Sequence, residues 1–572
     1  MRTSKYYFLI LVFISAFIFS FVIPVTAQIP PTPLNKGGLI SPYSPLNKGR
    51  IRGDYIIVQN DPGNLLDSGI KFYEQGKYDE SIKIWLEAEK SFNVKGDRYN
   101  QAITLNYLAL AYQNLGQWEN AETAINNALA LVTNPHPLTP SPTGEGEKLH
   151  FGVKESAVLA KILITQGSLQ LGKGETEKAL ETWIKAENIY KNNQDKTGVL
   201  GSRINQAQAL QKVGLFPLAK DLLEKSVEDI KQVGDVKLKI TGLRNLAIAW
   251  ENVGDLPKAE ELFLESLKLS ENAKLEQESS MTALDLGNNY RLKQQDDQAL
   301  KYYQKAAKTS NILIKTQAQL NQLTLLIKAE KNQEAKKLVK EIIGNIGNIP
   351  PSRAGIYAQA YLAQTLMKMT DSGVSDQEIG QILGRNIKQA EILKDIRSQS
   401  YTVGTLGKLY EKNQQWKEAE KLTSQALSLA QSINANDIMY QWQWQLGRIF
   451  KAQGEIKRAI ASETGAVNTL QLLRSDLIAV NPDIQFSFRE SVEPVYRELV
   501  SLLLDDGEKV GLKNNLKLAN NPKQNNLEQA LQVIEGLQLA ELENFFREAC
   551  LRSQAQQIDQ IDKKATVVYP II

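Results

Sequence analysis

The chain has 572 residues, of which 42% are hydrophobic and 23% charged, so it can bury an extended core. Its 67 basic and 64 acidic residues nearly cancel, and its repeats hold no cluster of Lys and Arg with interleaved aromatic residues, which argues against a nucleic-acid-binding protein. A single cysteine excludes an internal disulfide, so the fold must be held together by packing.

Residues 1–27 have the features of a secretory signal peptide. Two basic residues precede an apolar run at 6–23, and small residues ending at Ala27 lie before Gln28. Pro24 breaks the run and favours cleavage after Ala27, which predicts export to the periplasm or the extracellular space. The alternative is an uncleaved membrane anchor through 6–23, because this run approaches the about 20 residues that a spanning helix needs.

Residues 28–60 are expected to form a disordered linker, because this segment is rich in Pro, Gly, Asn and Lys and the sequence PLNKG occurs twice. A similar segment at 134–150 interrupts the repeats that follow and is also expected to be disordered. It contains both histidines of the chain, His136 and His150, with no carboxylate or cysteine cluster beside them. We therefore expect solvated histidines and no metal site.

The stretch 243–266 defines the repeating unit. Small Ala247 lies twelve residues before small Ala259, and a Gly-Asp turn separates the two. Trp250 and Phe263 follow these small residues at helical spacing, so each half of the unit has one packing face. The pattern predicts two helices that approach closely at their small residues while the rings fill the flanks.

The same layout recurs with a period near forty residues. The second small position is occupied, at intervals of 40, 58, 40, 40 and 40 residues, by Ser81, Ala121, Ala179, Ala219, Ala259 and Ala299. Twelve residues earlier lie Gly69, Ala109, Gly167, Ala207, Ala247 and Gly287. Four residues later lie Trp85, Ile125, Trp183, Leu223, Phe263 and Tyr303. A steady period indicates a solenoid. The interval of 58 exceeds 40 by 18, about the length of 134–150, so this segment is interpreted as an insertion between two hairpins.

Later copies are less regular. Ala335 marks a further hairpin, Pro350-Pro351 interrupts the array, and a diverged unit follows with helices predicted at 357–369 and 377–393. The strict register then returns at Gly407, Ala419, Gly447 and Ala459. Over residues 61–470 the sequence therefore predicts an all-α superhelical solenoid of about ten helical hairpins.

These copies resemble the tetratricopeptide repeat (TPR) family, whose order of small, aromatic, Gly, small, bulky and small residues they reproduce. The longer TPRs of the kinesin-light-chain type are the most similar, as in LNYLALAYQNLGQWENAETAINNAL at 105–129. Another helical repeat, such as HEAT, is the alternative, but the spacing of small residues within each hairpin matches TPR. The resemblance implies a concave groove lined by the first helix of each hairpin.

Polar residues on three successive first helices are candidates for contacting a partner in this groove. They are Asn205, Arg244, Asn245, Asn288 and Arg291. Amides can pair with the backbone of an extended peptide, and a guanidinium can grip a carboxylate through two hydrogen bonds. The alternative is that these side chains are solvated or bond a neighbouring hairpin.

The last hundred residues differ from the repeats. Residues 471–551 predict further helices, and 552–572 predict a linker and one apolar strand, ATVVYPII at 565–572. With FSFRESVEPVYRELVSLLL at 486–504, this region resembles the segment of cyanobacterial TPR proteins that leads into a CHAT domain, a caspase-like protease fold. In that family the catalytic His and Cys lie beyond the first strand. Cys550 precedes the strand and does not match the nucleophile, so the resemblance implies no activity.

Together these features predict an exported, noncatalytic TPR scaffold that binds a protein or peptide partner. No catalytic, cofactor-binding or metal-binding residues are expected, since the sequence has no glycine-rich phosphate loop or zinc spacing. Nucleic acid and small-molecule substrates are not expected partners, and membrane association is expected only if the signal segment stays uncleaved. The alternative function is the regulatory half of a CHAT protease whose catalytic half is missing or separately encoded.

Overall fold

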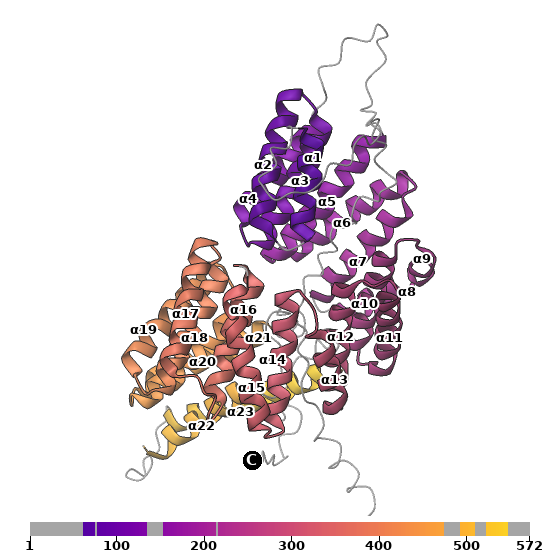
Figure 1. The fold of residues 1–572 in the computed structure, drawn as a ribbon. Helices are drawn as coiled ribbons and strands as arrows, with labels where there is room; N and C mark the ends of the chain where they lie inside the picture. The colour runs from indigo at the N-terminus through magenta and orange to yellow at the C-terminus, as the bar shows by residue number, and fades with distance from the viewer. Residues whose placement is uncertain are drawn as a thin grey trace, which may run out of the picture.

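In the computed structural model the chain is described at residues 61–74, 77–133, 153–212, 215–349, 351–473, 492–509 and 522–546. Every regular element in these ranges is a helix, which confirms the all-α expectation (Figure 1). The predicted signal peptide (1–27), linker (28–60), inserted segment (134–150) and terminal strand (565–572) lie outside the described residues. None of the described helices combines the length and the apolar character needed to cross a membrane.

Ten helical hairpins follow one another in the described residues, as the repeat pattern predicts. They are α1 (Pro62–Glu74) with α2 (Tyr78–Lys95), α3 (Arg98–Asn114) with α4 (Trp118–Thr133), α5 (Val153–Lys173) with α6 (Thr176–Asn192), α7 (Lys196–Lys212) with α8 (Phe216–Glu224) and α9 (Val227–Gln232), α10 (Val236–Asn252) with α11 (Leu256–Asn272), α12 (Glu276–Leu292) with α13 (Asp296–Ala306), α14 (Ile312–Lys328) with α15 (Asn332–Asn345), α16 (Arg353–Lys368) with α17 (Asp376–Ile392), α18 (Ile396–Lys412) with α19 (Trp416–Ser432), and α20 (Asn436–Ala452) with α21 (Ile456–Leu472). A short 3-10 helix, η1 (Ile346–Asn348), follows α15, and two further helices, α22 (Glu493–Lys509) and α23 (Pro522–Phe546), follow the array.

The small residues do what the pattern predicts. A Cβ added at Gly167 would lie 2.3 Å from the indole nitrogen of Trp183, so only glycine allows this ring to pack against the first helix. The indole N–H of Trp183 then donates to the carbonyl of Ile164 at 3.0 Å. Trp183 is 1% exposed. Trp85 lies against Gly69 and Tyr303 against Gly287 in the same way, so these hairpins are closed by a buried ring beneath a glycine of the first helix.

Capping side chains determine where the two helices of the diverged unit begin. The hydroxyl of Ser352 accepts a hydrogen bond from the backbone N–H of Gly355 at 3.1 Å and starts α16 four residues before the predicted 357. Ser375 and Glu378 form a capping box that starts α17. The predicted helix pair is present, and local capping sets its boundaries.

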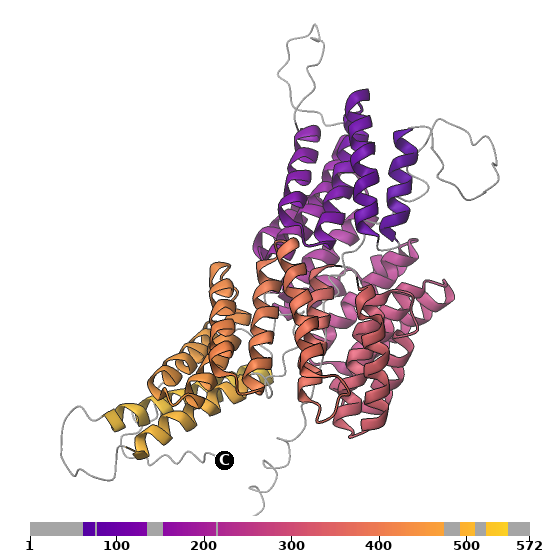
Figure 2. The same ribbon diagram turned by 60° about the vertical axis from the view of Figure 1, so that its left-hand side comes forward.

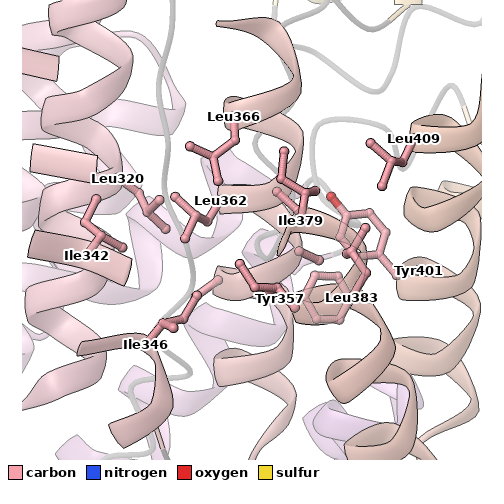
Figure 3. Packing of buried hydrophobic residues seen from close by; sticks show 14 of the residues in the cluster. Leu320, Ile342, Ile346, Tyr357, Leu362, Leu366, Ile379, Leu383, Tyr401 and Leu409 are labelled. Carbon is pink, nitrogen blue, oxygen red and sulfur yellow. The ribbon is translucent and has the colours of Figure 1, made fainter. Parts of the chain in front are cut away.

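The hydrophobic core runs along the array from hairpin to hairpin. One large cluster joins α14 to α20 and includes Leu320, Leu362, Leu383 and Tyr401 (Figure 3). Within it the rings of Tyr357 and Tyr401 stack with their centroids 4.6 Å apart, which ties α16 directly to α18. Neighbouring first helices are therefore packed against each other as well as against their own second helices.

The array curves so far that hairpins distant in sequence touch, and Figures 1 and 2 show α3–α5 beside α16–α17. Leu115, Ile356, Ala390 and Leu393 form a small buried cluster across this contact. Arg353 completes it from α16. We call the cluster, together with Arg353 and its partners Trp118, Gly172 and Asp395, the closing contact.

Arg353 is the polar centre of the closing contact. Its Nη1 donates to the carbonyl of Gly172 at 3.0 Å, and its guanidinium lies 4.7 Å from the ring centroid of Trp118. Its Nε and Nη2 donate to the two carboxylate oxygens of Asp395 at 2.7 and 2.9 Å. One guanidinium therefore binds the second and third hairpins to the eighth and ninth.

Candidate functional site: the first-helix face

The five predicted groove residues lie on the first helices α7, α10 and α12, as expected, but they are buried. The exposed fractions are 3% for Asn205, 5% for Arg244, 3% for Asn245, 2% for Asn288 and 1% for Arg291. Little of their surface is therefore exposed in the chain alone, and their contact with a partner stays a prediction. Neighbouring first helices cover them.

Three of the five bond to the next first helix or to the hairpin core. Nε and Nη2 of Arg244 on α10 both donate to Oδ2 of Asp285 on α12, at 2.7 and 2.6 Å. The side chain of Asn245 accepts a hydrogen bond from Gln208 on α7 at 3.1 Å. These contacts join helices one repeat apart.

Asn288 extends this polar ladder toward α14. Its Oδ1 accepts hydrogen bonds from the hydroxyl of Tyr303 at 2.8 Å and from Nδ2 of Asn321 at 3.2 Å. Arg291 lies beside the same hydroxyl, where it opposes the effect of burial, which raises the pKa of Tyr303. Asn205 shares the buried face of α7. The ladder fixes the spacing of the first helices, because unpaired polar groups at these depths would be costly.

Asp285 is a residue of this site that the sequence analysis missed. Burial raises the pKa of Asp285, and the adjacent Arg244 guanidinium opposes that rise. A signal was present in the sequence, since Arg244 and Asp285 are 41 residues apart, about one repeat. Arg397 and Asp437 form an ion pair at the corresponding separation of 40 residues. Opposite charges one repeat apart on first helices thus mark ladder contacts.

A different set of polar residues stays accessible further along the same face. Lys368 on α16, Lys408 on α18 and Arg448 on α20 lie on three successive first helices, and the charges of Lys368 and Arg448 act on Lys408. We call these three residues the basic cluster. Lys408 and Arg448 each follow the small residue of their helix, at Gly407 and Gly447, so they share one register position.

The members of the basic cluster differ in their partners. Arg448 donates from Nε and Nη2 to the carboxylate of Glu411 at 2.8 and 3.2 Å, and it lies 4.4 Å from the ring centroid of Trp444. Lys408 is half-buried and makes no hydrogen bond or ion pair with any residue that the structure describes. Burial and the nearby charges of Arg448 and Lys368 lower the pKa of Lys408 to about 8, against the opposing effect of Glu411.

This face carries charged side chains but no metal site among the described residues. Within the described ranges, no group of three or more His, Cys, Asp or Glu side chains is placed to hold a metal ion. His136, His150 and Cys550, which the sequence analysis considered, lie outside those ranges. The basic cluster, by contrast, presents a lysine that forms no ion pair with a described residue, and an ammonium group of this kind can bind a carboxylate or a phosphate.

No protein-family model and no curated protein sequence matches the chain. Among solved structures it is similar to yeast Tom70, with 16% identity over 78% of this chain and 96% of that chain and a TM-score of 0.40. It is also similar to the Rap conjugation gene regulator of plasmid pLS20 in complex with the Phr* peptide, with 13% identity, 72% and 97% coverage and a TM-score of 0.38. A human IFIT1 dimer with PPP-AAAA has 14% identity, 79% and 93% coverage and a TM-score of 0.42. The TPR-type arrangement itself is evident in the hairpins, where small residues and buried rings pack as the repeat pattern requires.

Proposed function

We propose that the chain is a noncatalytic scaffold that binds a protein or peptide partner on its first-helix face. An anionic segment of the partner lies over the basic cluster. The observation that carries this proposal is Lys408, which is half-buried near two other cations and forms no ion pair with a described residue. Glu411 also acts on Lys408, but its carboxylate is paired with Arg448. The like charges of the cluster repel one another, and a bound carboxylate or phosphate would offset that repulsion by attracting each cation.

The buried ladder has a supporting part in this proposal. Arg244, Asn245 and Asn288 bond to neighbouring hairpins, so they fix the curvature of the face on which the partner lies. Direct contact of Asn205, Arg244, Asn245, Asn288 or Arg291 with a partner remains a separate hypothesis. Their burial makes the basic cluster the better place to test for binding.

Fluorescence anisotropy with three pools of labelled extended peptides tests the proposal. One pool is rich in Glu, one replaces each Glu by Gln, and one replaces each Glu by Lys. We expect the Glu pool to bind most tightly and Lys408→Glu to weaken it by about tenfold or more, a typical effect of reversing a charge at a contact. Lys417→Glu is the matched control, because Lys417 is exposed on the second helix of the same hairpin.

Two results would reject the proposed site. One is equal binding of the Glu and Gln pools, which would show that negative charge is not recognised. The other is equal loss of binding in Lys408→Glu and Lys417→Glu, which would show that only the net charge of the protein matters.

A second function, the regulatory half of a CHAT-type protease, is favoured by one observation. The helix α22 belongs to the segment that carries the CHAT resemblance, and its Val495 and Leu499 are fully buried in a cluster shared with α21. A segment attached to the array in this way can transmit partner binding to whatever follows it. Mixing the purified chain with the product of the adjacent downstream reading frame and assaying peptide cleavage tests this proposal. Cleavage that needs both chains supports it, and no cleavage rejects it.

We further propose that the chain is exported and that its signal segment is removed after Ala27. The basis is the sequence of residues 1–27, an apolar run that ends in a proline and small residues. The alternative of an anchor through 6–23 predicts the same compartment for the array but leaves it attached to a membrane. Sequencing the N-terminus of the mature protein distinguishes the two.

A further inference from the structure

The last hairpin carries a carboxylate where other hairpins carry a core side chain. Four residues after the second small residue, earlier copies have buried side chains such as Trp183, Phe263 and Tyr303. In α21 the same position is Glu463, which is 1% exposed. A Cβ added at Gly447 would lie 2.3 Å from the Cγ of Glu463, so this side chain occupies the place beneath the glycine that a ring fills elsewhere.

Nothing in the described part of the chain satisfies this buried carboxyl fully. Its Oε2 is shielded from solvent and has no hydrogen-bond partner among those residues. The charged groups that act on it are Arg448 and Lys451 on α20 and Glu498 on α22. Burial and the Glu498 carboxylate raise the pKa of Glu463 to about 7, although the two cations oppose this.

Glu463 lies where the array meets the C-terminal helix pair. Glu498 accepts a hydrogen bond from the indole of Trp444 on α20 at 2.7 Å. On the neighbouring helix α23, Gln529 donates to the hydroxyl of Thr464 on α21 at 3.2 Å. We call this contact of α22 and α23 with the last hairpin the C-terminal joint. The carboxylate of Glu498 acts electrostatically on Glu463 across it.

We propose that Glu463 makes the C-terminal joint pH-sensitive: the protonated carboxyl allows α22 and α23 to dock on the last hairpin, and its ionisation loosens them. The direction of the pH effect follows from the burial of Glu463 and its nearness to Glu498. A carboxyl that is harder to ionise when docked than when released favours the docked form while it is protonated. That advantage declines as the pH rises above the pKa that Glu463 has in the released form, where Glu498 no longer acts on it, and is lost above about pH 7.

Hydrogen exchange of the full chain, resolved by peptide and corrected for the intrinsic pH dependence of exchange, tests this joint. We expect protection of residues 492–505 to fall by about fivefold to tenfold between pH 6 and pH 8, because a docked pKa of about 7 and a released pKa at least one unit lower give a change of that size. Glu463→Gln keeps the shape of the side chain without its charge, so its protection should stay at the high level across this range. Glu498→Gln should keep the step but move it to lower pH.

Controls separate this effect from a general one. Glu541→Gln removes another acid from the same helix pair, whose pKa is raised by burial and by Glu493, and it should leave the step in place. Glu463→Leu restores an apolar side chain at the ring position and serves as a second neutral variant if Glu463→Gln folds poorly. A wild-type step that persists in both neutral variants would overturn the proposal, as would constant wild-type protection from pH 6 to pH 8.

Discussion

Replacing Arg353 tests whether the array is held in its curved form by the closing contact. The Arg353→Met variant keeps much of the length of the side chain and removes its charge. It leaves Asp395 buried, with its side chain 1% exposed, and removes the link from α16 to the carbonyl of Gly172 and the ring of Trp118.

The expected cost can be worked out from these contacts. Removing one partner of a buried ion pair costs about 3–5 kcal/mol. The carbonyl hydrogen bond and the cation–π contact contribute about 1 kcal/mol each. Asp395 retains hydrogen bonds from the backbone and hydroxyl of Ser398, at 3.3 and 2.8 Å, which reduce the penalty of leaving it unpaired. We therefore expect a loss of about 3–5 kcal/mol, and partial recovery when Asp395→Asn is added.

A long repeat array need not unfold in one step, so the assay must be local. Hydrogen exchange should report faster opening at both sides of the closing contact, and small-angle X-ray scattering should report a larger radius of gyration. Lys394→Glu is the control, because Lys394 pairs with Glu119 in the same region but both side chains are more than three-quarters exposed. Unchanged exchange and dimensions in Arg353→Met, or equal effects in the control, would refute the reasoning.

Three further predictions concern the ladder, pH and processing. Arg244→Glu should lower the midpoint of thermal unfolding strongly, because it places a second carboxylate beside buried Asp285. The double variant Arg244→Met with Asp285→Leu should recover most of the loss. A change in the midpoint as small as that of a surface substitution would contradict the buried pair. Burial raises the pKa of Asp395, but its arginine and serine partners more than offset this and lower it overall, so its stabilisation is present at neutral pH and should be lost below about pH 4, seen as faster exchange at the closing contact on acidification. N-terminal sequencing of mature protein should begin at Gln28, and an intact Met1 in the membrane fraction would favour the anchor.

The hairpin architecture could be predicted because its determinants are local. Gly167 and Trp183 belong to one hairpin, and the need for a small residue beneath a ring is visible in their spacing. The closing contact could not be predicted in the same way. Arg353 meets the carbonyl of Gly172, 181 residues away, only because small rotations between hairpins accumulate along the array. The accumulated rotation cannot be read from the sequence of any single hairpin.

The site was harder to predict than the fold. Arg244 was placed correctly on a first helix, but its exposure depends on the neighbouring helix, which brings Asp285 to within 2.6 Å. Lys408 could not be singled out in the sequence, because its nearness to Arg448 and Lys368 becomes visible only when three successive helices are placed side by side. Glu463 differs from the repeat pattern already in the sequence, and its burial under Gly447 shows that the register was kept despite the change.

Hydrogen exchange of the wild-type chain with and without the Glu-rich peptide pool tests the central claim most directly, because it locates the bound peptide. We expect added protection on the first helices α18 and α20, around Lys408 and Arg448, and its loss in Lys408→Glu. Protection confined to second helices, or protection of α18 and α20 that survives Lys408→Glu, would contradict it.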